Sequence, residues 1–438
     1  MKTEFSPALL ADPANAASEA EIRRCVRCGF CTATCPTYVL LGDELDSPRG
    51  RIYLIKEMLE TQAEPSAEVV KHIDRCLSCL ACATTCPSGV DYRRLIDHAR
   101  AYVEERGHRP FMDRLYRGLL AAVMPYPMRF RAALFLARIV KPMAGSLRRK
   151  EALKPAAAML DLAPARPAPR ARPTAAPTAA PRRGRVAILT GCAEPVLRPQ
   201  VRAATSRLFG RMGLEIVPAP GEVCCGALVQ HLGREAAAKA AARTNVDAWT
   251  RLIEAGGLDA VVATAAGCGT SLKNYGELLA HDPAYAAKAA RVSALAKDVT
   301  EVVEAFGLPT AGKAPPLTVA YQSACSLQHG QGLREGPARL LSEAGFTVKQ
   351  PAESHLCCGS AGTYNILQPD LAARLRDRKL DRLSQLGADV VATGNIGCLT
   401  QLAEASAVPI VHTAELLDWA TGGPPPLEFD PTGAPRQR

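Results

Sequence analysis

Cysteine is the residue type whose spacing in this chain most clearly indicates chemistry. Residues 25 to 87 contain the pattern C-x-x-C-x-x-C-x-x-x-C-P twice, with the same spacing in both copies. Three cysteines on one tight loop can direct their sulfurs toward one small group, and a cubane iron–sulfur cluster needs four thiolates. The pattern predicts two [4Fe–4S] clusters, and its cysteines are Cys25, Cys28, Cys31 and Cys35 in the first motif and Cys76, Cys79, Cys82 and Cys86 in the second.

The fourth ligand of each cluster must come from outside the three-cysteine loop. In the bacterial two-cluster pattern, the Cys that precedes Pro ligates the other cluster. We therefore expect one cluster on Cys25, Cys28, Cys31 and Cys86, and the other on Cys76, Cys79, Cys82 and Cys35. Zinc is the alternative, because C-x-x-C also occurs in zinc ribbons. A zinc site would leave the third Cys and the Cys-Pro of each motif without a role.

The other eight cysteines belong to an internal duplication in the C-terminal half. Each copy has a single Cys, a Cys-Cys-Gly after 31 intervening residues, and a further Cys. The offsets between the copies are 133, 133 and 130 residues, which is too regular for unrelated loops. The first copy contains Cys192, Cys224, Cys225 and Cys268, and the second contains Cys325, Cys357, Cys358 and Cys398.

Three interpretations of these duplicated sets remain open. Each set can bind a further iron–sulfur cluster, act as redox thiols or a zinc site, or consist of buried and inert structural cysteines. A Gly directly after a Cys pair allows the backbone to approach a bulky ligand closely, which favours the cluster.

Short β-branched runs alternate with helical sequence throughout this half. Such runs begin near residues 185, 259, 317 and 389, and helices are predicted over 199–211 and 235–254. This alternation predicts a parallel sheet in each copy. The cysteines follow the strands directly, and open α/β sheets bind ligands at the carboxyl ends of their strands. We expect the four thiols of each copy to converge there.

The N-terminal part is predicted to be helical around its two motifs. Ser47 followed by Pro48 is an N-cap signal for a helix, a second helix is expected over about 66–75, and a third over 91–105. The fold class is therefore a multidomain α+β protein. Its predicted parts are an α-helical ferredoxin-type domain (1–105, motifs at 25–36 and 76–87), a basic helical segment (106–160), a Pro/Ala linker (161–184), two α/β domains (185–312 and 313–420) and a disordered tail (421–438).

Charge is concentrated in one region of the 438-residue chain. The net charge is +10, and residues 101 to 185 contain 18 Lys or Arg against 5 Asp or Glu. No nucleic-acid-binding motif accompanies this excess, so nucleic acid is not an expected partner. The apolar and basic sequence over 110–143 predicts a helix packed on its own domain or on a partner subunit. The alternative is a helix that lies on a membrane surface.

The sequence lacks the motifs of several common cofactor-binding sites. No G-x-G-x-x-G follows a predicted strand and no P-loop is present, so we expect neither a flavin nor a nicotinamide on this chain and no catalytic residues. An iron–sulfur protein without an organic cofactor needs a partner protein that performs the two-electron chemistry. The clustered cysteines, the absence of a secretory h-region and the lack of an apolar run of ~20 residues predict a cytoplasmic protein.

The N-terminal motifs resemble those of one family. The stretches Cys25 to Tyr38, Leu41 to Lys56, Asp74 to Cys79 and Ala83 to Gly89 are similar to the iron–sulfur subunits of bacterial glycolate oxidase. The duplicated Cys-Cys-Gly (CCG) domains resemble a wider class that includes heterodisulfide reductase and the iron–sulfur subunits of anaerobic glycerol-3-phosphate and lactate dehydrogenases.

The resemblance implies an electron-transfer subunit of an oxidoreductase. A flavoprotein subunit would oxidise glycolate to glyoxylate, alongside a second subunit of the flavin-binding type. This chain would then pass the electrons to a quinone or another acceptor, not to oxygen or NAD. Peripheral attachment to the inner face of the cytoplasmic membrane is compatible with that role.

The sequence departs from the fuller CCG motif at one position in each copy. That motif ends in C-x-x-C, but here Ser271 follows Cys268 and Gln401 follows Cys398 at this spacing. The departure argues against the five-thiolate cluster of heterodisulfide reductase and against thiol/disulfide catalysis. The alternatives are an iron–sulfur subunit for a D-lactate or glycerol-3-phosphate dehydrogenase, a heterodisulfide-reductase-like catalyst, and a non-enzymatic scaffold or sensor.

Overall fold

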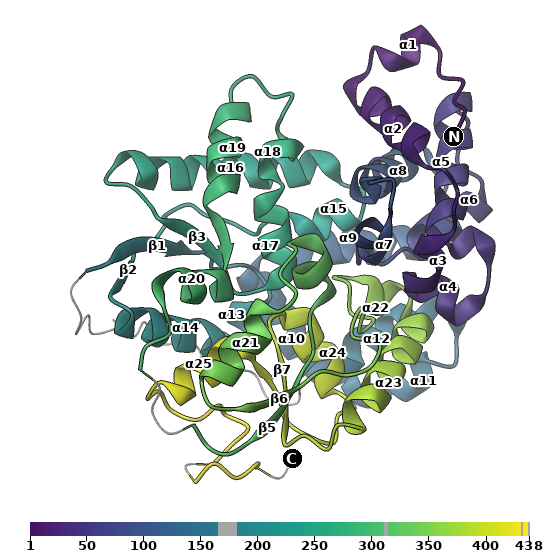
Figure 1. Ribbon diagram of the computed structural model, residues 1–438. Helices are drawn as coiled ribbons and strands as arrows, with labels where there is room; N and C mark the ends of the chain where they lie inside the picture. The colour runs from purple at the N-terminus through teal and green to yellow at the C-terminus, as the bar shows by residue number, and fades with distance from the viewer. Residues whose placement is uncertain (165–181, 311–313, 431, 437–438) are drawn as a thin grey trace.

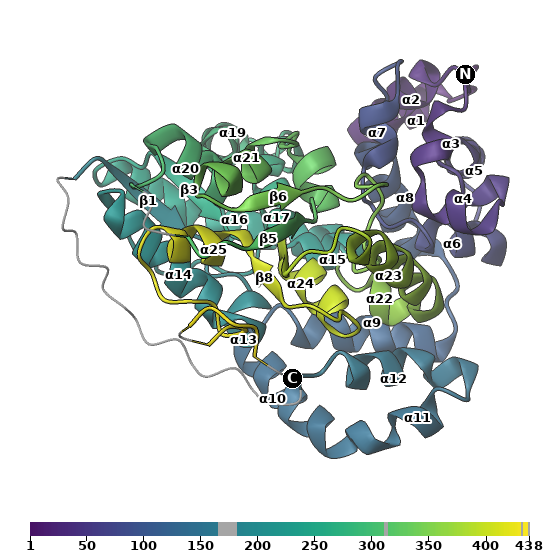
Figure 2. The same ribbon diagram turned by 60° about the horizontal axis from the view of Figure 1, so that its bottom comes forward.

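The computed structural model describes residues 1–164, 182–310, 314–430 and 432–436. A helical N-terminal domain stands beside two α/β units, and a group of helices crosses beneath all three (Figures 1 and 2). Most of the predicted Pro/Ala linker, 165–181, lies outside the described residues.

Each α/β unit is built on a four-stranded parallel sheet, which confirms the predicted fold class. The strand orders are β2-β1-β3-β4 and β6-β5-β7-β8, so the second sheet repeats the topology of the first. The strands are β1 (Gly184–Ile188), β2 (Leu214–Ile216), β3 (Ala260–Ala263), β4 (Ala296–Asp298), β5 (Thr318–Tyr321), β6 (Thr347–Lys349), β7 (Val390–Thr393) and β8 (Ile410–His412).

The two sheets share one hydrophobic core. Val186 and Val262 of the first sheet belong to the same buried cluster as Val319 and Val390 of the second. These β-branched side chains explain why the runs form strands, because they pack well on a pleated surface. The shared core holds the two copies as one body.

Helices cover both sheets and begin where the sequence signals them. α14 (Pro199–Arg211) and α16 (Glu235–Glu254) have the predicted bounds. The remaining helices of the first copy include α13 (Glu194–Leu197), α15 (Ala227–His231), α17 (Ala266–Lys273), α18 (Tyr275–Leu278), α19 (Ala286–Leu295) and α20 (Val299–Phe306). Those of the second are the π-helix η4 (Ser326–Gly330), α21 (Gly336–Glu343), α22 (Tyr364–Leu367), α23 (Pro369–Ser384), α24 (Ile396–Ala403) and α25 (Thr413–Ala420).

The N-terminal domain consists of short helices around the two cysteine motifs. Ser47 and Ser66 cap two of these helices, since their hydroxyls accept hydrogen bonds from the amides of Gly50 and Val69. The helices are α1 (Pro7–Leu10), α2 (Pro13–Arg24), α3 (Phe30–Thr34), α4 (Pro36–Leu41), α5 (Pro48–Thr61), α6 (Ala67–Asp74), α7 (Ala81–Thr85) and α8 (Tyr92–Arg106), with the 3₁₀ turn η1 (Glu44–Asp46) before α5.

The basic segment forms helices that run beneath the other parts (Figure 2). Leu120 packs against Leu228 of the first copy and Ile366 of the second, while Arg117 pairs with Asp74 of the N-terminal domain. Within the described residues, no helix is both long enough and apolar enough to cross a membrane. The helices are α9 (Phe111–Val123), α10 (Pro127–Val140), α11 (Ala144–Leu147) and α12 (Lys154–Asp161).

The C-terminal segment differs from the predicted disorder. Phe429 is buried and its ring lies 5.2 Å from that of Trp419, centroid to centroid. Glu428 forms an ion pair with Arg198 of the first copy. In the described part of this segment, Phe429 and Glu428 therefore contact the two copies, although its Pro- and Gly-rich composition alone suggests disorder.

Candidate metal centres

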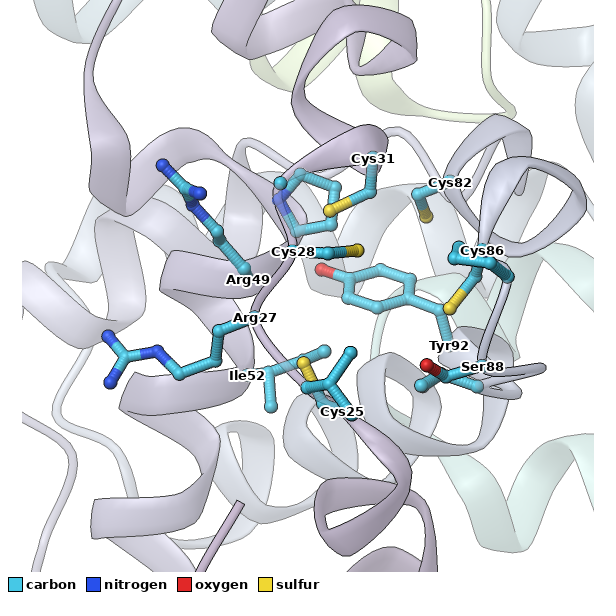
Figure 3. A pocket seen from close by; sticks show the side chains of 15 residues that line it. Cys25, Arg27, Cys28, Cys31, Arg49, Ile52, Cys82, Cys86, Ser88 and Tyr92 are labelled. Carbon is cyan, nitrogen blue, oxygen red and sulfur yellow. The ribbon is translucent and has the colours of Figure 1, made fainter.

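The first cavity of the N-terminal domain is lined by Cys25, Cys28, Cys31 and Cys86. Figure 3 shows their sulfurs around one space, which Cys82 also lines. Arg27 and Gly29 adopt left-handed backbone conformations (φ 58° and 89°), which curl the loop so that its sulfurs face inward. Three of these cysteines come from the first motif and Cys86 comes from the second, the exchange that the sequence predicts.

The second cavity repeats this arrangement with the motifs exchanged. It is lined by Cys76, Cys79 and Cys82 of the second motif and by Cys35 of the first. Ser78 and Leu80 have the left-handed conformations that Arg27 and Gly29 have in the other loop (φ 49° and 62°). Cys82 lines both cavities, so the two sites are adjacent.

The cysteine thiols that line both cavities are suitable ligands for a cluster of metal cations. Burial raises the pKa of the Cys31 thiol to about 11, and it raises the pKa of Cys79 and Cys82 well above the usual value. Thiols in such surroundings need a compensating cation to become thiolates, and metal coordination supplies it. An iron–sulfur cluster held by these residues would store and release single electrons.

A buried charge network surrounds Cys35. Arg51 is 1 % exposed, and its Nη1 donates toward the Cys35 Sγ at 3.8 Å. Its Nη2 donates to Asp46 Oδ1 at 3.2 Å, and its Nε donates to the carbonyl oxygen of His72 at 2.7 Å. Arg51 therefore presents a fixed positive charge to the second cavity.

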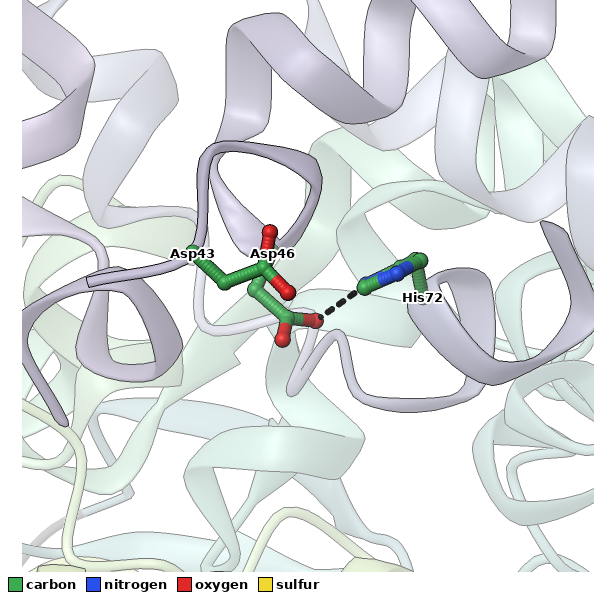
Figure 4. Close-up of side chains that lie close together, drawn as sticks. All are labelled: Asp43, Asp46 and His72. Carbon is green, nitrogen blue, oxygen red and sulfur yellow. Dashed lines mark hydrogen bonds and ion pairs between the residues drawn. The ribbon is translucent and has the colours of Figure 1, made fainter. Parts of the chain in front are cut away.

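Asp46 lies beside Asp43 and His72 (Figure 4), a trio with metal-ligand chemistry. Its Oδ1 accepts from His72 Nδ1 at 2.9 Å, and its Oδ2 accepts from Arg75 Nη1 at 2.8 Å. The Asp43 carboxylate caps the amide of Leu45. Since two arginines already neutralise Asp46, the trio orients Arg51 and is a poor metal site.

The four thiols of the first CCG copy converge at the carboxyl ends of its strands. Cys225 Sγ lies 3.3 Å from Cys268 Sγ, and Cys192 packs against the same buried cluster as Cys224. Gly226 has a φ of 84°, and a Cβ there would lie 3.2 Å from the carbonyl oxygen of Ala238. The glycine of the Cys-Cys-Gly sequence is thus required by a turn that packs tightly on α16.

The second copy gathers its thiols in the same way. Cys325 Sγ lies 3.7 Å from Cys357 Sγ, and Cys358 Sγ lies 3.3 Å from Cys398 Sγ. The convergence predicted from the strand ends is therefore present in both copies. All 16 cysteines are free thiols, and each four-thiol set has the ligand number of an iron–sulfur cluster.

The residues at the missing fifth-cysteine positions are buried and hydrogen-bonded. Ser271 Oγ donates to the carbonyl oxygen of Cys225 at 3.3 Å, and Gln401 Nε2 donates to that of Ala372 at 3.3 Å. Ser271 thus supports the loop that carries its Cys pair, whereas Gln401 binds α23 and also accepts from Asn365 Nδ2. Neither offers a thiolate, which agrees with the sequence argument against a five-thiolate cluster.

The second copy adjoins the second cavity of the N-terminal domain. Cys79 shares one hydrophobic cluster with Cys325, Cys357 and Tyr364. The adjacent helices are tied together, because Thr84 Oγ1 hydrogen-bonds to His329 Nδ1 at 2.7 Å. Two thiol groups that lie 246 residues apart in sequence are therefore neighbours.

Sequence reasoning missed two charged residues beside these thiols, Arg51 and Lys379. Each lies on the buried face of a helix, where an apolar residue is expected. Lys379 follows Ala372 and Leu375 at helical spacing, and all three are buried. The sequence did contain a signal for them, which is a single charged residue among apolar residues at helical spacing. Such a residue is expected to be buried next to a group that pairs with its charge.

Comparison with known proteins agrees with this geometry. A family model described as a 4Fe-4S dicluster domain matches residues 21–90, and one described as a cysteine-rich domain matches residues 186–273 and 319–403. The chain is 41% identical to the glycolate oxidase iron-sulfur subunit of Escherichia coli over 96% of this chain and 99% of the relative. It is 33% identical to the probable glycolate oxidase iron-sulfur subunit of Bacillus subtilis over 92% and 95% of the two chains.

More distant relatives share only part of the chain or the fold. Lactate utilization protein A of Bacillus subtilis is 24% identical over 53% of this chain and 99% of its own length. The crystal structure of a hypothetical protein from Helicobacter pylori matches with a TM-score of 0.54 at 10% identity, and the match covers 94% of this chain and 73% of that one. The latter likeness concerns the fold alone.

Proposed function

The chain belongs to the family of glycolate oxidase iron–sulfur subunits, and on this premise we propose that it carries electrons from a flavoprotein subunit to a quinone-type acceptor. The flavoprotein, accompanied by a second subunit of the flavin-binding type, would oxidise glycolate to glyoxylate. This chain would supply thiolate ligands for iron–sulfur clusters and no flavin. Its domains would follow the predicted division, with boundaries near residues 105, 160, 184, 312 and 420.

The observation that carries the proposal is the continuity of the thiol sites. Cys28 at the first cavity is exposed, Cys82 borders both N-terminal cavities, and Cys79 adjoins Cys325. We assign one [4Fe–4S] cluster to Cys25, Cys28, Cys31 and Cys86, and one to Cys76, Cys79, Cys82 and Cys35. The series of sites then extends from the exposed Cys28 to the second copy, with each site next to the following one.

The surface around the first cavity suits contact with a redox partner. Val26 and Phe30 flank the exposed Cys28, and both are more than half exposed. Arg27 lies over the ring of Tyr53 at 5.7 Å and adds a positive charge to this apolar surface. A flavoprotein that docks here would place its cofactor near the first cluster.

A second surface supports peripheral contact with an anionic membrane. Residues 114 to 150 contain nine Lys or Arg and no Asp or Glu. This segment exposes large apolar side chains, which include Leu115, Leu119, Met128, Phe135, Leu136, Ile139 and Met143. Apolar side chains interleaved with cations are the pattern of helices that lie on membrane surfaces. This contact would bring the chain to a membrane-dissolved quinone.

A flavoprotein that oxidises lactate is the second candidate partner. The match to lactate utilization protein A covers about half of this chain. This similarity supports lactate as a second hydroxyacid whose oxidation could supply the electrons. Independent thiol/disulfide catalysis is less well supported, because Ser271 and Gln401 replace the fifth cysteines.

The decisive experiment is anaerobic purification followed by iron and sulfide analysis and EPR of the reduced protein. About eight iron atoms per chain correspond to two [4Fe–4S] clusters, and about twelve to sixteen would add the CCG sets. Glycolate together with the copurified flavoprotein subunit should reduce the clusters, whereas D-lactate tests the second candidate. Zinc in place of iron, or clusters that neither substrate reduces, would contradict the proposal.

A further inference from the structure

The two CCG thiol sets come from a duplication, yet their surroundings differ at one equivalent position. A Cβ on Gly226 would meet Ala238, and a Cβ on Gly359 would meet Ala372, so these alanines are equivalent residues of α16 and α23. Seven residues further along each helix, the first copy has Asn245 and the second has Lys379.

Both side chains are buried and bind the loop that carries the Cys pair. Asn245 is neutral, and its Nδ2 donates to the carbonyl oxygen of Cys224 at 3.2 Å and to the hydroxyl of Tyr275 at 3.0 Å. Lys379 is 3 % exposed, and its Nζ donates to the carbonyl oxygens of Glu353 and Ser354 at 2.9 and 3.4 Å. Only the second copy therefore has a buried ammonium at this position.

The ammonium is fixed on the loop that leads into the Cys pair of its own copy, because its acceptors Glu353 and Ser354 precede Cys357 by four and three residues. Burial lowers the pKa of Lys379, and the charges of Cys358, Cys357, Cys398 and Cys325 oppose that shift. A buried positive charge favours the more negative state of a nearby group. Reduction of a thiolate-bound cluster adds one negative charge, so Lys379 favours the reduced form in the second copy and Asn245 gives no such bias in the first.

The copies also differ in their contact with the N-terminal domain. Cys79 packs in one cluster with Cys325 and Cys357, and Tyr364 lies among them. The hydrophobic cluster that contains the four thiols of the first copy consists only of residues from the range 187–296. The first copy meets the N-terminal domain through other residues, for example Glu277, which pairs with Arg93.

We propose that the second CCG copy, and not the first, is the electron relay next to the N-terminal domain, with Lys379 as the positioning residue that favours its reduced state. The inference rests on the proposed electron-transfer function. One electron leaves the group held by Cys35, Cys76, Cys79 and Cys82 and enters the group held by the second copy. No bond forms or breaks, and the flavoprotein partner is the source of the electron.

The first test compares equivalent cysteines of the two copies in the full chain. Cys398→Ala and Cys268→Ala each remove the last thiol of one set, and neither residue belongs to the cluster around Cys79. In the reduced wild-type protein, a paramagnetic group in the second copy should speed the EPR relaxation of the neighbouring N-terminal cluster. We expect Cys398→Ala to abolish this effect and Cys268→Ala to retain it. The reverse result, or equal relaxation in all three proteins, would overturn the inference.

The second test addresses the charge of Lys379. Lys379→Gln should lower the midpoint potential of the second-copy signal in an EPR-monitored redox titration and leave both N-terminal potentials unchanged. Arg378→Gln is the matched control, because its guanidinium pairs with Glu353 in a partly exposed ion pair. An unchanged second-copy potential in Lys379→Gln would contradict the role of Lys379. Failure of the proposed function would look different, because the N-terminal cluster signals themselves would be missing or would not respond to the flavoprotein.

Discussion

The guanidinium of Arg51 lies 3.8 Å from the sulfur of Cys35, and both side chains are buried in the N-terminal domain. Hydrogen bonds and positive charge directed at a cluster sulfur stabilise the reduced cluster. The Asp46 carboxylate holds Arg51 in this position and is itself shared with His72 and Arg75. The charged residues around Cys35 thus place a fixed positive charge beside the second cavity.

Arg51→Gln should lower the midpoint potential of the cluster in the second cavity and leave that of the first unchanged. The substitution removes the buried cation and the donor to Cys35, and it leaves Asp46 with fewer partners, which costs ~3–5 kcal/mol of stability. EPR-monitored redox titration measures the potentials. Lys56→Gln is the control, because Lys56 lies on the same helix and pairs with Glu60 near the surface. Equal shifts of both clusters would refute a local effect of Arg51.

The exchange of ligands between the motifs can be tested by pairs of variants. Cys86→Ser should perturb the same EPR signal as Cys28→Ser, because both residues line the first cavity. Cys35→Ser should perturb the signal that Cys76→Ser perturbs, because both line the second. If the variants instead group by motif, with Cys35 following Cys28, the assignment is wrong.

Gly359→Ala should destabilise the protein more than Gly226→Ala. Both glycines have a φ above 80°, where a Cβ is strained, at a cost of ~1–2 kcal/mol. At Gly359 the new Cβ would also lie only 2.5 Å from the carbonyl oxygen of Ala372, whereas the corresponding distance at Gly226 is 3.2 Å. Thermal unfolding under anaerobic conditions compares the two variants. Equal midpoints would show that the backbone of α23 moves freely to accept the methyl group.

The C-terminal segment should contribute to global stability through Phe429. Phe429→Ala removes a fully buried aromatic ring from the shared core, and such truncations cost ~3–5 kcal/mol. Urea unfolding followed by circular dichroism measures the loss. Leu427→Ala changes a neighbouring residue that is more than half exposed, and we expect it to be nearly neutral. A neutral Phe429→Ala would restore the prediction of a disordered tail.

Glu415 should make stability depend on pH. Burial raises the pKa of its carboxyl group from 4.5 to about 8 in the folded chain, so the folded protein binds a proton that the unfolded chain releases between these values. The contribution is fully present below pH 4.5 and is lost as the pH rises toward 8. Glu415→Gln should flatten this slope in thermal unfolding measured from pH 5 to 8. Glu343→Gln, on the exposed side of α21, should retain the wild-type slope.

The cysteine motifs determined by themselves what kind of protein this is. Ligand spacing is local, so Cys25, Cys28 and Cys31 indicate a cluster before any fold is known. The duplicated Cys-Cys-Gly sets and the β-branched runs before them predicted parallel sheets, because strand pattern and cysteine position are both written along the chain. Helix caps such as Ser47 fixed the beginnings of the helices for the same reason.

Only the tertiary structure decided how these parts are connected. The neighbourhood of Cys79 and Cys325 depends on how one domain packs against another, and no local pattern encodes that contact. The roles of Arg51 and Lys379 likewise depend on burial, since the same residues on a surface would be solvated and screened. Phe429 shows the same limit, because its burial in a core built from distant residues is not encoded in the composition of the segment around it. Spacing and periodicity are properties of the chain, whereas burial and proximity arise only when the chain folds.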